Sequence, residues 1–294
     1  MGAKLRDIQR RIKSIESTQK ITKAMELISA SRIIRAERRV HESRPYAEKI
    51  AQVIRDLGAT TERLEHPLLE SPEQGGNGLV VITADRGLAG AYNANALRLA
   101  ERTRREIEPA EVYAIGRKGI SAFRFRRVER RAEWFGFSDN PTYEAAREIS
   151  EKVISDFSDG SLRSARLVYT RFESIMVQRP LVLDLLPVKA EVVEGGHAYS
   201  PLFEFEPEPS ELLAELLPRY VEMQIFYALL SSAASEHAAR RRAMSAATDN
   251  AEELIETLTR VMNQARQSEI TAEIADIVGG SEALRAKAEA GVSA

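Results

Sequence analysis

Few residues in this sequence have the types and spacing that catalysis needs. The segment Gly87–Gly90 follows a short apolar run and precedes a helical pattern, which is where phosphate-binding loops lie. It does not match the dinucleotide fingerprint GxGxxG, and it lacks the Gly-Lys-Ser/Thr of a P-loop. The histidines show no metal-site or triad spacing: His41, His66, His197 and His237. We therefore expect no catalytic residue, no metal and no cofactor, while a nucleotide-dependent α/β enzyme stays open as an alternative.

The polar residues around this segment have simpler structural interpretations. Asp85 and Arg86 follow the apolar run, and we expect them to form a local ion pair that shapes the loop. Trp134 is expected to be a core or interface aromatic residue, and His237 a packing or surface residue of a helix. None of these interpretations involves proton transfer.

The composition is that of a soluble globular protein with a highly charged surface. Of its 294 residues, 44% are hydrophobic and 29% charged, and the net charge of −2 does not favour coating nucleic acid or an anionic membrane. Cysteine is absent, which excludes disulfides and thiolate metal sites and fits a reducing compartment. Met1–Arg11 lacks the apolar core of a signal peptide, and no apolar run reaches the ~18 residues of a membrane span. We expect any membrane contact to be made through partners.

The middle of the chain alternates predicted strands and helices. The predicted strands are Leu79–Thr83, Val112–Ile115, Ala165–Val177 and Leu181–Leu186. The predicted helices are Asn95–Ile107, a short segment ending at Phe125, and Thr142–Phe157. This alternation favours a Rossmann-like α/β domain over residues 75–193, with a parallel or mixed sheet.

The amino-terminal segment, residues 1–58, is predicted to be one long helix. Apolar residues recur at steps of three and four, as in a coiled-coil seam: Leu5, Ile8, Ile12, Ile15, Ile33, Ala36, Val40, Ala47, Ile50, Ile54 and Leu57. Between these groups the stripe is expected to drift through Ile21, Met25 and Ile28. Pro45 either kinks the helix or is absorbed in it, and Gly58 is its expected end.

This first helix is basic over residues 1–44, with twelve Lys or Arg against five Asp or Glu, a local net charge of +7. A nucleic-acid-binding helix, a solvated face and a helix lying against acidic protein surfaces are three interpretations of that charge. The basic residues are spread around the helix without interleaved aromatic residues, which disfavours the nucleic-acid interpretation.

The carboxy-terminal segment, residues 208–286, is predicted to be a second long helix, opened by Ser210 and ended by Gly279-Gly280. Its predicted seam is Met244, Ala247, Ala251, Leu254, Leu258, Val261, Ala265, Ser268, Ala272 and Ala275. Between Leu230 and Ala251, twelve of 22 residues are Ala or Ser, small enough for close helix packing. We predict that residues 208–286 pair with residues 1–58 as a long antiparallel two-helix coiled coil.

Several segments resemble a known family. In the first helix they are Arg11–Ile15 and Thr18–Glu26. In the second helix they are Ala243-Met244, Ala247–Ala251, Asn263, Ala265–Gln267, Ile270-Thr271, Glu273-Ile274 and Ile277–Gly280. The middle agrees through Thr83, Asp85–Leu88, Gly90, Asn93, Asn95 and Gly116–Gly119. On these residues the chain resembles the gamma subunit of F-type ATP synthase over nearly its whole length.

The sequence departs from the family pattern at two places. Ala89 stands where the family often carries a cysteine, and Met262-Asn263-Gln264 replaces the usual Tyr-Asn-Arg or Tyr-Asn-Lys. The second change removes an expected cation beside the helix pair. The sequence has no long cysteine-bearing insertion of the plastid kind, so thiol regulation is not expected.

The resemblance implies a non-catalytic central-stalk rotor of a proton- or sodium-translocating synthase, which couples ion-driven rotation to ATP synthesis or hydrolysis at the beta subunits. The paired helices would stand within the alpha and beta subunits, and the α/β domain would touch the epsilon subunit and the c-subunit ring. The complex would be peripheral, at the cytoplasmic face of the cell membrane. By the family's pattern, the coupling residues would be Lys20, Lys23, Met25, Arg266, Gln267 and Thr271. The alternatives, an enzyme with helical arms and a coiled-coil nucleic-acid-binding protein, would show tight nucleotide binding or salt-dependent binding to duplex DNA.

Overall fold

Two long helices form the ends of the chain in the computed structural model, which describes residues 3–60, 66–188 and 209–292. They are α1, Ala3–Thr60, and α5, Pro209–Val292. The chain divides into a helical unit, residues 1–26 with 244–294, and a sheet unit, residues 27–243. His197 and residues 189–193 of the predicted α/β domain lie outside the described residues.

The sheet unit contains a five-stranded mixed sheet in the order β3-β2-β1-β4-β5. The strands are β1 Gly76–Ile82, β2 Ala110–Ile115, β3 Arg130–Trp134, β4 Leu162–Phe172 and β5 Gln178–Leu186. All neighbours pair in parallel except β5, which runs antiparallel to β4. The expected mixed sheet is confirmed. The edge strand β3 was not predicted, because its five residues are mostly charged and carry no run of apolar side chains.

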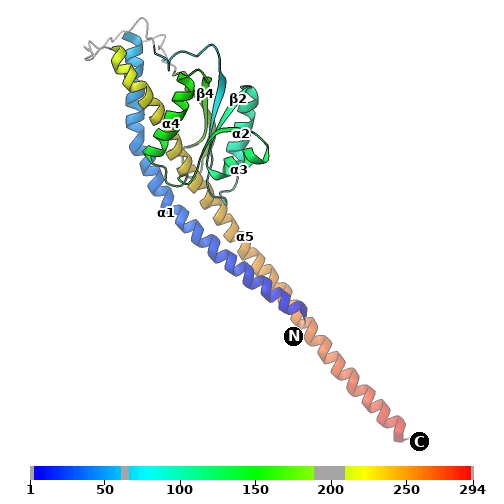
Figure 1. The fold of residues 1–294 in the computed structure, drawn as a ribbon. Helices are drawn as coiled ribbons and strands as arrows, with labels where there is room; N and C mark the ends of the chain where they lie inside the picture. The colour runs from blue at the N-terminus through cyan, green and yellow to red at the C-terminus, as the bar shows by residue number, and fades with distance from the viewer. Residues whose placement is uncertain (1–2, 61–65, 189–208, 293–294) are drawn as a thin grey trace. The chain divides into compact units, whose positions relative to one another are not determined.

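Helices cover both faces of the sheet, as Figure 1 shows. Leu79 and Val81 of β1 face α2, Tyr92–Glu106, and α3, Arg117–Phe125. Val80 and Ile82 face the opposite layer, which contains α4, Tyr143–Ser158, together with parts of α1 and α5. Successive side chains of a strand point to opposite faces, so a strand buried on both sides is a continuous apolar run.

Within the sheet unit, α1 and α5 lie side by side and antiparallel (Figure 1). Ile33 and Val40 of α1 share a core cluster with Leu230, Ala234 and Ala238 of α5. Further along α1, Ile50 and Ile54 cluster instead with earlier α5 residues, including Leu213 and Leu217. Residues later in α1 therefore pack against residues earlier in α5. The two helices are antiparallel here, as predicted.

Within the helical unit, α1 and α5 meet at a polar contact. The hydroxyls of Thr22 and Thr248 are 2.8 Å apart, and both side chains are buried. Leu5 and Ile8 are buried near the start of α1, whereas α5 residues 270–282 are exposed. Residues 270–282 of α5 thus present their side chains on the surface of this unit.

The seams differ in part from the predicted ones. On α1 the expected drift is wrong: Ile21 is 58% exposed and Ile28 is 53% exposed, while Thr22 and Ser29 are buried. A strict three-four spacing continues through polar residues there and leaves the isoleucines outside the seam.

On α5, the predicted Met244, Ala251, Leu258 and Ala265 are buried or half-buried. At two seam positions between these, the less exposed residue is one position later than predicted. Leu254 and Val261 are exposed, and their neighbours Ile255 and Met262 are half-buried. Ser268, Ala272 and Ala275 are also exposed. Adjacent residues are both apolar at 254–255 and at 261–262. Either member of each pair satisfies the heptad spacing, so the sequence does not specify which one faces α1.

Neither long helix ends at its predicted glycine. α1 runs past Gly58 to Thr60, and α5 runs past Gly279-Gly280 to Val292. Glycine in a helix interior costs only about 1 kcal/mol relative to alanine, so a helix can continue through it. Pro45 and Pro218 both lie inside these helices.

Candidate functional site

The loop between β1 and α2 is held by backbone contacts that require glycine. Thr83 donates from its hydroxyl to the Ile115 carbonyl and accepts from the Gly119 amide, both at 2.8 Å. Gly116 has a φ of +90°, and a Cβ there would lie 2.1 Å from the Thr83 carbonyl oxygen. Only glycine fits so close an approach at that backbone angle.

Asp85 organises three segments of backbone rather than forming the expected ion pair with Arg86. Its carboxylate accepts hydrogen bonds from the amides of Arg117 at 3.1 Å, Gly136 at 2.8 Å and Ser138 at 3.0 Å. All three donors lie beyond the carboxyl ends of β2 and β3 in the chain. The ion-pair prediction is wrong because a carboxylate surrounded by backbone N–H groups is satisfied without a cation.

The crevice at the carboxyl ends of the strands is occupied by α5. The sheet order reverses at β1, between β2 and β4, and open α/β sheets bind ligands outside that switch point. β4 extends beyond its last pairing with β1, at Val168. Its next amides donate to α5 serines: Thr170 to Ser232 at 3.3 Å and Phe172 to Ser231 at 2.8 Å.

The same helix also binds the loop Asp85–Gly90. Arg240 donates from Nε and Nη2 to the Gly87 carbonyl, at 3.3 and 3.2 Å, and from Nη2 to Glu236 at 2.6 Å. Burial raises the pKa of Glu236, and Arg240 opposes that rise. Burial, reinforced by Glu236, likewise raises the pKa of Tyr92 in this cluster. These groups are packed against the chain itself, in the place where a nucleotide would bind.

His237 is a packing residue, as one of its two interpretations predicts. Its side chain is buried, and Nε2 lies 3.1 Å from the Asp139 carbonyl, which can only accept a hydrogen bond. Burial lowers the pKa of His237 to about 4, so the ring is neutral at physiological pH. The Asp139 carboxylate pairs with Arg32 of α1 at 2.7 Å.

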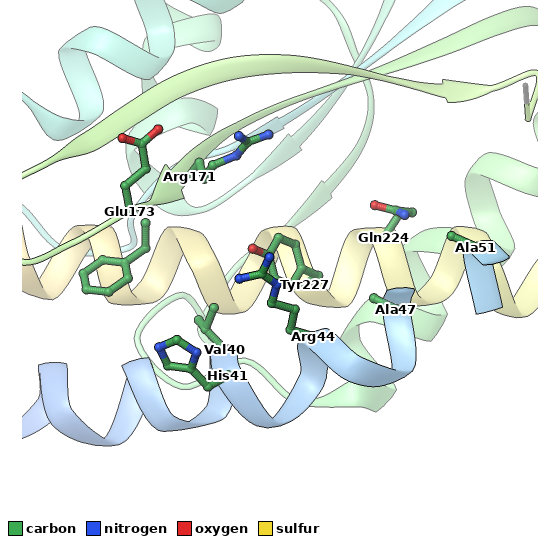
Figure 2. Close-up of a pocket in the computed structure, with 10 residues that line it drawn as sticks. Val40, His41, Arg44, Ala47, Ala51, Arg171, Glu173, Gln224 and Tyr227 are labelled. Carbon is green, nitrogen blue, oxygen red and sulfur yellow. The ribbon is translucent and has the colours of Figure 1, made fainter. Parts of the chain in front are cut away.

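A cavity of about 610 Å³ lies between α1, α5 and the end of β4. Figure 2 draws the side chains that line it. His41 and Arg44 come from α1, Arg171 from β4, and Tyr227 from α5. Glu173 also lines the cavity, and it pairs with Arg179 at 3.2 Å. No buried nucleophile or acid–base pair is found among the lining residues, so this cavity does not supply an active site.

The six expected coupling residues lie in the helical unit, at two levels. On α1, Lys20 and Lys23 are exposed, Met25 is half-buried, and Lys23 pairs with Glu26 at 3.0 Å.

On α5, Arg266 and Gln267 are exposed, and the exposed Thr271 donates its hydroxyl to the Gln267 carbonyl at 2.9 Å. Thr22 of α1 meets Thr248 of α5, and Arg266 lies about 27 Å further along α5 at 1.5 Å per residue. The structure therefore does not bring the α1 set and the α5 set together.

Among the residues that the structure describes, no helix is both long and apolar enough to cross a membrane. No group of three or more His, Cys, Asp or Glu side chains in the same residues is placed to hold a metal ion.

Comparison with known proteins identifies the family. A family model described as ATP synthase matches residues 4–284. The ATP synthase gamma chain of a Nocardioides species is 47% identical over 305 residues, which cover 99% of each chain. This chain belongs to the ATP synthase gamma family. The gamma chain of Acidothermus cellulolyticus is 48% identical over 295 residues, covering 97% of this chain and 98% of that one.

Solved structures of ATP synthase rotors and central stalks share the fold. The rotor of the Euglena gracilis mitochondrial ATP synthase matches with a TM-score of 0.67 and 16% identity, covering 92% of this chain and 100% of that chain. A central stalk and c-ring structure from Tetrahymena thermophila matches with a TM-score of 0.58 and 23% identity, covering 77% and 99%.

Sequence reasoning missed the polar contacts that α5 makes with the sheet. Ser231, Ser232 and Ser235 were counted only as small residues that would let α1 approach. The same stretch of small residues in this chain also contains two opposite charges four residues apart, Glu236 and Arg240. Two charged residues in a helix segment that is otherwise small and suited to burial could have indicated a buried polar contact.

Proposed function

We infer that this chain is the non-catalytic central-stalk rotor subunit of an F-type ATP synthase. The supporting observation is that a chain 47% identical to gamma chains over its full length builds its two ends into antiparallel paired helices. The filled crevice agrees with a mechanical role, because the usual ligand site of a doubly wound sheet is taken by α5.

The partners follow from exposed apolar side chains. Ile270, Ile274 and Ile277 of α5 and Ile21 of α1 are all exposed, although large apolar side chains favour burial. We propose that the alpha and beta subunits cover them, and that the epsilon subunit and the c-subunit ring contact the α/β domain.

Coupling would arise from unequal contacts between the helix pair and the three beta subunits. A ligand or partner shifts a conformational equilibrium only by its difference in affinity for the two states. We propose that Lys20, Lys23 and Met25 act at one level of the helical unit, and that Arg266, Gln267 and Thr271 act at another. Each contact would bias a beta subunit toward an empty, ADP-holding or ATP-holding state.

The complex would lie at the cytoplasmic face of the cell membrane and would transport protons or sodium ions through its membrane ring. The test is to tag this chain in its own cells and purify what it binds. We expect the alpha, beta, epsilon and c subunits to co-purify, and inverted vesicles to pump ions when ATP is added. Recovery of the chain without those subunits would contradict the assignment, as would tight binding of labelled ATP to the isolated chain at Asp85–Gly90.

A further inference from the structure

We propose that Arg240, held by Glu236, is a positioning residue that fastens the loop Asp85–Gly90 to α5, so that the α/β domain and the long helix turn as one body. This inference rests on the proposed rotor function. It assigns part of the torque path to a buried contact inside the chain, rather than to its outer surface.

The contact is built deeply into the sheet unit. The side chains of Arg240 and Glu236 are 7% and 1% exposed, and Nη2 of Arg240 lies 2.6 Å from Glu236. Nε and the same Nη2 of Arg240 also donate to the Gly87 carbonyl, in the loop that Asp85 ties to the segments after β2 and β3. A movement of the loop therefore moves the ends of three strands.

Two further attachments lie on the same helix. One to three turns earlier, Ser231 and Ser232 accept from the β4 amides, and Ser235 donates to the Thr170 carbonyl at 3.2 Å. Just after Arg240, Arg242 donates to the carbonyls of Ile175 and Met176, both at 2.9 Å. The sheet is thus held to α5 at β4, at the loop after β1 and at the β4–β5 turn.

Burial separates the two arginine attachments, whereas the buried serines fasten β4 rather than the loop. Arg242 is exposed, so water can replace its bonds when the turn shifts. Water cannot readily replace the bond between Arg240 and Gly87, and breaking it would leave Glu236 and Arg240 as a buried pair without their third partner. We expect Arg240 to be the attachment whose loss most increases relative motion of loop and helix.

The test uses the assembled complex in inverted membrane vesicles, with Arg240→Met, Arg240→Lys and the neighbouring control Arg241→Met. Amide hydrogen exchange of residues 85–90 should accelerate roughly ten- to a hundredfold in Arg240→Met, as loss of a charged hydrogen bond predicts. Ions pumped per ATP hydrolysed should fall, with Arg240→Lys between Arg240→Met and wild type. Arg241→Met should match wild type in both measurements.

A disulfide separates positioning from any other role of Arg240. A Cβ at Gly90 would lie 3.6 Å from that of Ala243, within the ~3.5–4.5 Å of disulfides, and the chain has no other cysteine. Gly90→Cys with Ala243→Cys is added to Arg240→Met and compared oxidised and reduced. Because Gly90 has a φ of +55°, which strains a cysteine, the same cysteine pair with Arg240 intact is the reference. We expect oxidation to restore pumping per ATP and to slow the exchange.

Two results would overturn the proposal: normal coupling and exchange in Arg240→Met, or a disulfide that slows exchange without restoring coupling. If Arg240→Met does not assemble, the same comparison is made with Arg240→Lys, and unchanged exchange there is equally decisive. Failure of the proposed function is distinguishable, because the wild-type chain would then support no ATP-driven pumping at all.

Discussion

Asp156→Asn is expected to destabilise the α/β domain by about 2 kcal/mol at neutral pH. Asp156 is 2% exposed and accepts hydrogen bonds from Tyr113 at 2.6 Å, from Arg131 twice at 2.9 Å and from Lys152 at 2.9 Å. Burial by itself raises the pKa of this carboxyl, but the three donors outweigh it and lower the pKa from 3.8 to about 2. Each unit of pKa difference between the folded and unfolded chain corresponds to 1.36 kcal/mol, which gives the magnitude.

The pH dependence has a definite sign. The carboxyl has a lower pKa folded than unfolded, so its contribution is complete above pH 3.8 and is lost as the pH falls toward about 2. The difference in unfolding free energy between wild type and Asp156→Asn should therefore be constant from pH 7 to about pH 5 and shrink below pH 4.

The assay is thermal or urea unfolding of the purified chain, followed by fluorescence of Trp134, the single tryptophan, which stacks on Tyr113 at 6.5 Å. A loss of about 2 kcal/mol should lower Tm by roughly 4–8 °C in a domain of this size. The matched control is Glu151→Gln. It removes the other i, i+4 ion pair of α4, Arg147–Glu151 at 2.7 Å, which is exposed and should leave Tm unchanged. An Asp156→Asn effect no larger than that of Glu151→Gln would refute the reasoning, as would a difference that persists at pH 2.

Three other predictions address the sheet loop and the helix pair. Gly116→Ala should prevent the sheet unit from folding, because its Cβ would lie 2.1 Å from the Thr83 carbonyl; a far-ultraviolet circular dichroism spectrum and melt like those of wild type would contradict this. Thr22→Cys with Thr248→Cys should form an intramolecular disulfide, since the hydroxyls are 2.8 Å apart; non-reducing electrophoresis that shows only dimers would count against antiparallel pairing. Met25→Lys should give an assembled complex that hydrolyses ATP but pumps ions poorly, because the added cation can bind acidic groups of a beta subunit too strongly; an unassembled or fully coupled complex would show the idea to be wrong.

The sequence alone determined the element types and the family. Heptad spacing at Leu5 and Ile8 and at Ala251 and Leu258 is local information. It predicted the long helices, the described α1 seam outside Ile21–Ile28, and half of the α5 seam. A parallel or mixed sheet was predicted from the alternation of apolar strands with helices. The two helical motifs, with agreement around Asp85, placed the chain in its family. These features could be found because each depends on neighbours within a few residues.

Only the tertiary structure decided which neighbours the polar residues meet. Thr22 lies in the seam and Ile21 outside it because the partner helix fixes the facing side, which spacing on one helix does not specify. Asp85 binds amides that lie 32 to 53 residues away in the chain rather than Arg86 beside it. Arg240 reaches Gly87 across 153 residues, so the filled crevice is a product of chain topology. Hydrogen bonds and burial depend on proximity in space, and sequence periodicity records only proximity along the chain.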